Sequence, residues 1–152
     1  MKKDMPALQS LKEKIASTGL KVTQQRLVIL QALYENDDHP SAEVVYNHLS
    51  NENPSLSLGT VYKTLETLVE KSIIRKVYCA DGIKRYDVHI EPHSHLHCQS
   101  SHRIIDFSDP ALEAMILQYL QDKKIENFEI QDIQLQIQGH IPNPEKRVRI
   151  YA

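Results

Sequence analysis

The feature that most constrains the fold is a series of amphipathic segments that ends in a β-hairpin signal. Apolar residues recur at helical spacing in four segments, residues 6–18, 23–35, 42–53 and 58–72. Two β-rich stretches follow, IIRKVYCA and RYDVHI, joined through Asp81 and Gly82, a strong hairpin turn. Helices followed directly by a hairpin are typical of a winged helix-turn-helix domain, whose last helix lies in the DNA major groove.

Capping residues indicate where the helices begin. A hydroxyl or carboxylate side chain precedes four amphipathic segments, at Thr23, Ser41, Ser57 and Asp109. Such side chains accept hydrogen bonds from the free N–H groups of the first helical turn. In the third helix we expect Val44, Val45 and Leu49 to face the core.

The fourth helix has the surface of a DNA reader. Its polar face near the N-terminus offers Ser57, Thr60, Tyr62, Lys63 and Thr64. Small hydroxyls, an aromatic ring and a cation can reach phosphates or base edges. A structural helix with a polar outer face is the alternative. Net charge does not distinguish a DNA-binding helix from a structural one. Residues 1–88 hold 12 Lys and Arg against 11 Asp and Glu, and residues 89–152 hold 6 against 9.

The second half predicts a small mixed unit. Short strands are expected at SHLHCQ and HRIIDF, and an alternating strand at NFEIQDIQLQIQG. Between them, a helix from Pro110 carries apolar residues at Leu112, Met115, Ile116, Tyr119 and Leu120. A unit of this size buries little by itself, so we expect a homodimer. The fold class is therefore α/β (α+β), with a winged-helix domain at 1–88, a hinge at 89–92 and a dimerisation domain at 93–152.

A dense histidine cluster predicts a metal site. Five of the eight histidines lie between residues 89 and 102. His93 and His95 are separated by one residue, so on a strand both leave the same face and can converge on one ion. Asp106 lies in the apolar run RIIDF, where a carboxylate needs a partner. Imidazole suits zinc, iron, nickel and copper. The alternatives are a solvated histidine-rich loop or a tag, but a tag would be terminal.

The remaining composition indicates a cytoplasmic protein. Cys79 and Cys98 cannot build a disulfide framework. No apolar run approaches eighteen residues, and the first residues, MKKDMPALQS, lack the apolar core of a signal peptide. We therefore expect no membrane association.

Four segments together resemble one family. They are GLKVTQQRLVIL, HPSAEVVY, SLGTVYKTLETLVEKSII, and HSHLHC followed by IIDF. In their order and spacing, the chain resembles the ferric uptake regulator (Fur) superfamily of metal-dependent bacterial repressors over nearly its whole length. The resemblance implies a winged-helix domain, a dimerisation domain and a regulatory metal at the hinge between them.

The resemblance also implies a ligand set for that metal. The family's ligands fall on five positions of this chain, His39, Asp87, His93, His95 and Asp106. One ion would then bind groups from both domains and favour the closed arrangement that fits DNA. Mixed nitrogen and oxygen ligands suit Fe(II) or Mn(II), with Zn(II) possible. A further metal position of some relatives holds Pro92, Ser94 and Ile133 here, with only Glu113 left, so we expect one regulatory ion per subunit.

Aspartate at two ligand positions resembles the peroxide-sensing branch. Iron sensors of the family tend to carry glutamate where this chain has Asp87 and Asp106. In peroxide sensors, bound Fe(II) reacts with hydrogen peroxide and a ligand histidine is oxidised. The corresponding targets here are His39 and His93 or His95. The alternative is a sensor of iron or zinc availability that represses metal-uptake genes.

The family's structural zinc site is incomplete here. The first of its two C-x-x-C pairs reads Cys98, Gln99, Ser100, Ser101, and the second is absent. We therefore expect no structural zinc. A residual site built from Cys98, His102 and His140 is the alternative.

The resemblance maps DNA contacts onto three residues. Tyr62 and Lys63 would lie in the major groove and Lys21 toward the minor groove of an AT-rich inverted repeat. Lys63 replaces a commoner arginine. Because lysine lacks the bidentate fork that reads guanine, base preference there is expected to be softer.

Two other classes compete with a repressor. A metal-binding enzyme would use His93, His95 and Asp106 as an open site, but no general base or H-E-x-x-H helix accompanies them. A winged-helix dimer without metal control would not need five intact ligands. We expect a regulator and no enzyme.

Overall fold

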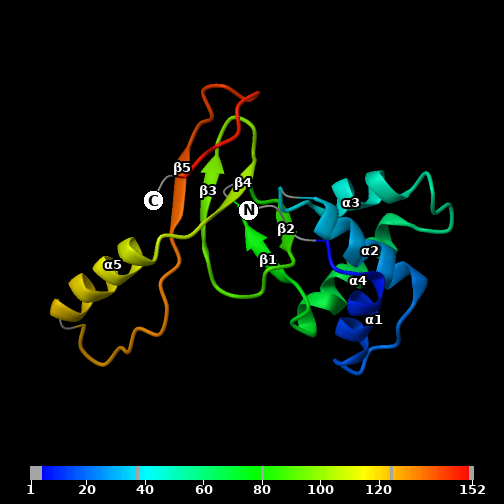
Figure 1. The fold of residues 1–152 in the computed structure, drawn as a ribbon, viewed down its shortest axis with the longest axis horizontal. Helices are drawn as coiled ribbons and strands as arrows, with labels where there is room; N and C mark the ends of the chain where they lie inside the picture. Colours follow the sequence, from blue (N-terminus) through cyan, green and yellow to red (C-terminus); the bar gives the residue numbers. More distant parts are fainter. Residues whose placement is uncertain (1–4, 37, 80, 124, 151–152) are drawn as a thin grey trace. The chain divides into compact units, whose positions relative to one another are not determined.

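The protein divides into two compact units, Met1–Ile90 and Glu91–Ala152. The computed structural model describes residues 5–36, 38–79, 81–123 and 125–150 (Figure 1). Helices dominate the first unit and strands with one helix form the second. This confirms the predicted α+β class.

The first unit has four helices followed by a hairpin. The elements are α1 (Leu8–Ala16), α2 (Gln24–Glu35), α3 (Ala42–Leu49), α4 (Leu58–Glu70), β1 (Arg75–Tyr78) and β2 (Lys84–Asp87). Three predicted N-caps accept hydrogen bonds from backbone N–H groups: Thr23 from Arg26, Ser41 from Val44 and Ser57 from Thr60. The predicted order and the starts of α2, α3 and α4 are therefore confirmed, whereas α1 begins two residues later than predicted and α3 ends at Leu49 and not at residue 53.

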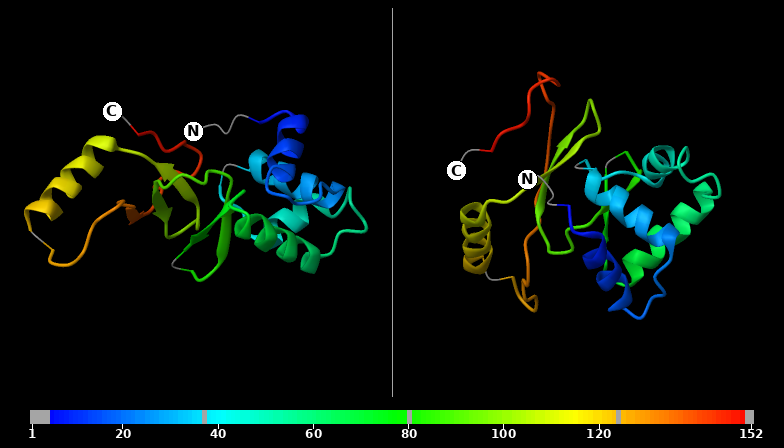
Figure 2. Two further views of the ribbon diagram at one scale, coloured as in Figure 1. Left: turned by 90° about the horizontal axis from the view of Figure 1, so that it is seen from below. Right: turned by 45° about the vertical axis from the view of Figure 1, so that its right-hand side comes forward.

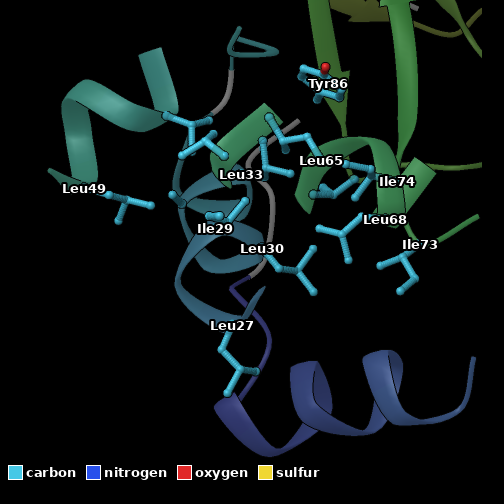
Figure 3. Packing of buried hydrophobic residues seen from close by; sticks show 14 of the residues in the cluster. Leu27, Ile29, Leu30, Leu33, Leu49, Leu65, Leu68, Ile73, Ile74 and Tyr86 are labelled. Atoms are coloured by element: carbon cyan, nitrogen blue, oxygen red, sulfur yellow. The ribbon is translucent and has the colours of Figure 1, made fainter. Parts of the chain in front are cut away.

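The core of the first unit lies between α2, α4 and the start of the hairpin. Leu30 and Leu33 of α2, Leu65 and Leu68 of α4 and Ile74 are almost completely buried (Figure 3). Burial of each aliphatic side chain of this size contributes about 1.5–3 kcal/mol to the free energy of folding.

Two predicted orientations are wrong. Val44 is 44% exposed, because Ala42, Val45 and Leu49 form the buried stripe of α3 and position 44 lies on the other side of the helix. Thr64 is only 8% exposed, since it stands between Val61 and Leu68 on the buried side of α4. It is therefore not part of the polar face.

The hairpin is antiparallel and attached to the loop before α3. Its register runs from Arg75 opposite Asp87 to Tyr78 opposite Lys84. Gly82 turns the chain with φ 75°, a left-handed conformation that favours glycine. The backbone N–H of Tyr86 donates to the carbonyl of Pro40 at 3.1 Å. This bond places the end of β2 beside the loop at residues 38–41.

The second unit is built on a three-stranded sheet. Its elements are β3 (Ser94–Cys98), β4 (Ile104–Phe107), α5 (Pro110–Asp122) and β5 (Gln136–Gly139), with strand order β4-β3-β5. β3 is antiparallel to β4 and parallel to β5.

The last strand is much shorter than predicted. Ile130, Ile133 and Leu135 precede β5, which begins at Gln136. The cause is the length of the neighbouring strand: β3 has five residues, and its pairing with β5 starts at His95. Residues before 135 therefore have no β3 backbone to pair with.

α5 is a helix with an unburied apolar face. The side chain of Asp109 accepts from the N–H of Leu112 at 3.0 Å, as its capping position predicts. Both views in Figure 2 show α5 beside the sheet, beyond β5. No residue of α5 is buried, and Met115 and Tyr119 are 68% and 59% exposed. None of the helices in the described residues is long and apolar enough to cross a bilayer.

Truncation of one core leucine tests this packing. Leu68→Ala is expected to lower the free energy of unfolding of the first unit by about 2–5 kcal/mol, because the substitution leaves a cavity among buried side chains. Leu8→Ala is the matched control: Leu8 is 51% exposed, so its truncation is expected to cost less than about 0.5 kcal/mol. Urea unfolding followed by helical circular dichroism measures both. Equal losses would contradict the described core.

Candidate functional site

The second unit brings three predicted metal ligands together. His93 directly precedes β3, and the β3–β4 register places His95 opposite Asp106. Nε2 of His93 lies 3.1 Å from Oδ1 of Asp106, and Nε2 of His95 lies 3.8 Å from the same oxygen. The two imidazole rings are 4.5 Å apart between centroids. The predicted convergence of His93, His95 and Asp106 is therefore present within one unit.

The donor set of these three residues fits a divalent transition metal. One ligand atom from each lies within 4.8 Å of the others. Two imidazole nitrogens and a carboxylate oxygen suit iron, manganese or zinc better than magnesium or calcium, which prefer oxygen alone. His95 is buried and the other two are partly buried, so this donor group is largely shielded from water.

The first unit holds a second imidazole–carboxylate pair. Nε2 of His39 lies 3.3 Å from Oδ2 of Asp87, and both side chains are fully buried. His39 has φ 50°, a conformation that is costly for a residue other than glycine. The bond between Tyr86 and Pro40 holds the chain next to it. Asp87 also accepts from the backbone N–H of His89 at 2.9 Å.

The five predicted ligands thus form two groups of the same chemical type. His39 and Asp87 belong to the first unit, and His93, His95 and Asp106 belong to the second. That all five bind a single ion stays a prediction. His97, for which no role was predicted, is buried and its ring nitrogens lie 3.1–3.2 Å from the amide nitrogen of Gln136.

The sulfur of Cys98 is bonded by the loop that follows β3 and by the segment after β5. It lies 3.3 Å from Oγ of Ser100 and accepts from the N–H of Ile141 at 3.4 Å. Hydrogen bonds from Ser100, and then Ser101, lower the pKa of Cys98 to about 6. His102 and His140 are exposed, and in the described part of the chain they form no metal-competent cluster with Cys98. The residual zinc site stays a prediction.

The polar face of α4 carries the predicted DNA contacts. Ser57, Tyr62 and Lys63 are exposed and Thr60 is half-buried. The hydroxyls of Ser57 and Thr60 are 2.9 Å apart. Lys21 is exposed, and its carbonyl accepts from Nη1 of Arg26 at 2.6 Å, which fixes the backbone beside it.

Sequence reasoning missed one residue on this surface. The hydroxyl of Tyr62 donates to the carboxylate of Glu43, which lies 19 residues earlier, in the first turn of α3. The pair depends on how α3 packs against α4. No local pattern in the sequence indicates it.

Known proteins with similar sequences are peroxide regulators. The chain is 30% identical over 134 residues to the peroxide-responsive repressor PerR of Staphylococcus aureus, covering 85% of this chain and 87% of the relative. It is 34% identical over 107 residues to the peroxide operon regulator of Bacillus subtilis, covering 70% of this chain and 71% of the relative.

Solved structures with the same fold are metal regulators. A zinc-bound manganese uptake regulator matches with a TM-score of 0.74 and 29% identity, covering 86% of this chain and 98% of that one. The Helicobacter pylori ferric uptake regulator, described as having three functional metal binding sites, matches with a TM-score of 0.72 and 25% identity, covering 91% and 95%. The ferric uptake regulator family model matches residues 17–138. The chain belongs to the ferric uptake regulator family.

Proposed function

We propose that this protein is a metal-dependent, peroxide-responsive transcriptional repressor. The observation that carries the proposal is the presence, in each unit, of an imidazole–carboxylate group suited to a transition metal. We propose that one Fe(II) or Mn(II) ion per subunit is bound by His39, Asp87, His93, His95 and Asp106. The named relatives, both peroxide regulators, support the repressor function.

The ligands can couple metal binding to DNA binding because they come from both units. His39 lies in the loop before α3, and Asp87 is the last residue of β2, so both belong to the proposed DNA-binding unit. His95 and Asp106 are placed by the β3–β4 register, and His93 directly precedes β3. An ion held by both groups favours the arrangements that keep them together, so its binding free energy selects a DNA-competent state.

DNA reading is proposed for α4 and the segment before α2. Tyr62 and Lys63 on the exposed face of α4 would enter the major groove, supported by Ser57 and Thr60 at its N-terminus. Lys21 would approach the minor groove. An AT-rich inverted repeat is the proposed site, because a twofold dimer reads two half-sites.

The apolar face of α5 supports a homodimer. Met115 and Tyr119 are largely exposed in the single chain, and a patch of this kind is characteristic of a subunit interface. A second copy that covers α5 would also enlarge the small core of the second unit.

Peroxide sensing is supported by the two aspartates and by the relatives. Bound Fe(II) would activate hydrogen peroxide, so that one peroxide oxygen enters a C–H bond of a ligand imidazole, which gives up two electrons, and the other oxygen leaves as water. The ligand imidazoles are the nearest oxidisable groups to that metal, so His39 and His93 or His95 are the proposed targets. Loss of a ligand would weaken metal binding and release DNA. The structural neighbours favour one alternative, regulation by metal availability, because they are uptake regulators.

Removal of one ligand is expected to abolish metal control. Mn(II) should increase the affinity for an AT-rich inverted repeat by at least about tenfold. His93→Ala should remove this effect, because it deletes a proposed ligand whose Nε2 lies 3.1 Å from the carboxylate of Asp106. His48→Ala, at an exposed histidine of α3, is the matched control and should keep the metal effect. Fluorescence anisotropy with and without metal measures both. Equal affinity of the wild type in the two conditions would contradict metal control.

Peroxide should modify a ligand histidine. Iron-loaded protein treated with hydrogen peroxide is expected to gain one oxygen atom on His39, His93 or His95, and manganese-loaded protein is expected to gain none. Peptide mass spectrometry locates the oxygen. Modification confined to Cys79 or Cys98 would indicate a thiol switch instead. Iron-loaded protein that stays unmodified and bound to DNA would favour the metal-availability alternative.

Charges on α5 should dissociate the dimer. The double substitution Met115→Glu and Tyr119→Glu is expected to weaken self-association at least tenfold, because it places unpaired carboxylates in an apolar interface. Gln121→Glu adds a charge on the opposite side of α5 and should leave the dimer intact. Sedimentation equilibrium measures the association constant. A wild-type chain that stays monomeric at micromolar concentration would rule out this dimer.

A further inference from the structure

The Tyr62 side chain on the exposed face of α4 is held by a carboxylate. Its hydroxyl donates a hydrogen bond to Oε1 of Glu43, and both side chains are exposed, Tyr62 by 38%. The two residues belong to different helices, α4 and α3. The orientation of the phenol is therefore set by helix packing and not by α4 alone.

Glu43 occupies a position where a carboxylate is favoured. It lies in the first turn of α3, just after the N-cap Ser41, where a negative charge is favoured by the helix dipole. The hydrogen bond from Tyr62 is the main cause that lowers the pKa of Glu43, and the same bond raises the pKa of Tyr62. Glu43 is consequently ionised at neutral pH, and Tyr62 keeps its proton. The donor and acceptor roles in this pair are thereby defined.

This pairing limits what Tyr62 can offer to a base. A phenol has one hydrogen to donate and lone pairs that accept. With its hydrogen directed at Glu43, Tyr62 presents only an acceptor to the major groove. Adenine N6 and cytosine N4 are donors there, whereas thymine O4 and guanine O6 and N7 are acceptors. When its hydrogen is donated to Glu43, the Tyr62 hydroxyl can accept a hydrogen bond from adenine or cytosine. It cannot form one with thymine or guanine, because both groups would then be acceptors.

We propose that Glu43 is a specificity-determining residue that makes Tyr62 an acceptor-only reader of one base pair in each half-site. Glu43 acts through Tyr62 and is a positioning residue. The proposal rests on the proposed function, in which α4 lies in the major groove. Glu43 also has a second effect, because its negative charge is repelled by the DNA phosphates. The residue therefore lowers the affinity for all DNA sequences and at the same time increases base specificity.

Site selection from a randomised duplex library tests the proposal. Manganese-loaded full-length protein is compared with Glu43→Ala, Tyr62→Phe and the double variant, and the selected duplexes are sequenced. The wild type is expected to prefer adenine or cytosine at one position of each half-site by about fivefold, the lower end of a direct base contact. Glu43→Ala should lose that preference, keep the rest of the motif, and bind all sequences more tightly at low salt.

The other variants separate positioning from charge. Tyr62→Phe should lose the same base preference, and the double variant should show no further loss, because Glu43 acts through the hydroxyl. Glu70→Ala, at the exposed end of α4, removes one negative charge as a matched control and should leave the motif unchanged. If Glu43→Ala selects the same DNA motif as the wild type while Tyr62→Phe selects a different one, the role of Glu43 is wrong but the DNA-reading function stands. A wild type that selects no sequence would overturn the DNA-reading function and this inference with it.

Discussion

The first unit depends on the hydrogen bonds made by Tyr86. Its side chain is fully buried, and its hydroxyl donates to Glu66 of α4 at 3.1 Å, while its backbone N–H donates to Pro40 at 3.1 Å. The hairpin is thereby bonded to α4 and to the loop before α3 through one residue. A hydrogen bond from Lys76 is the main cause that lowers the pKa of Glu66, which stays an ionised acceptor. Without that acceptor, the buried hydroxyl would cost about 1–3 kcal/mol.

The same bonds position the buried pair His39 and Asp87. Asp87 follows Tyr86, and His39 precedes Pro40, so the backbone contact between Tyr86 and Pro40 brings the carboxylate and the imidazole to 3.3 Å. In the second unit, the β3–β4 register likewise brings an imidazole and a carboxylate together, because it places His95 opposite Asp106. A slip of one residue would turn one of these side chains to the other face of the sheet. Backbone pairing therefore brings together His39 and Asp87 in one unit and His95 and Asp106 in the other.

Local signals predicted more of the fold than of the surface. The caps at Thr23, Ser41, Ser57 and Asp109 could be predicted because each interacts with backbone a few residues away. The length of β5 could not, since it is set by a five-residue partner strand distant in sequence. The exposure of Val44 and the burial of Thr64 were misjudged, because the buried stripe of a short helix depends on its neighbours.

In the candidate site, too, local patterns predicted some residues and long-range contacts determined the others. The pairing of His93 and His95 follows from strand periodicity and was predictable. The assignment of His39 and Asp87 needed the family resemblance, since 48 positions of chain separate them and nothing local connects them. The bond between Glu43 and Tyr62 had no sequence signal, because it arises from two helices in contact.

The two units differ in how much buried apolar surface supports them, and this difference bears on the proposed metal control. Among the described residues, the second unit buries only Cys98 and Ile104 as apolar side chains, whereas the first unit has a continuous core. A ligand that binds the folded state at 100 times its Kd adds about 2.7 kcal/mol of stability. That amount is small for the first unit but large for the β3–β4 pair, whose strands carry His95 and Asp106. In the proposed function, metal binding would therefore stabilise the second unit more than the first, in addition to selecting the DNA-competent state.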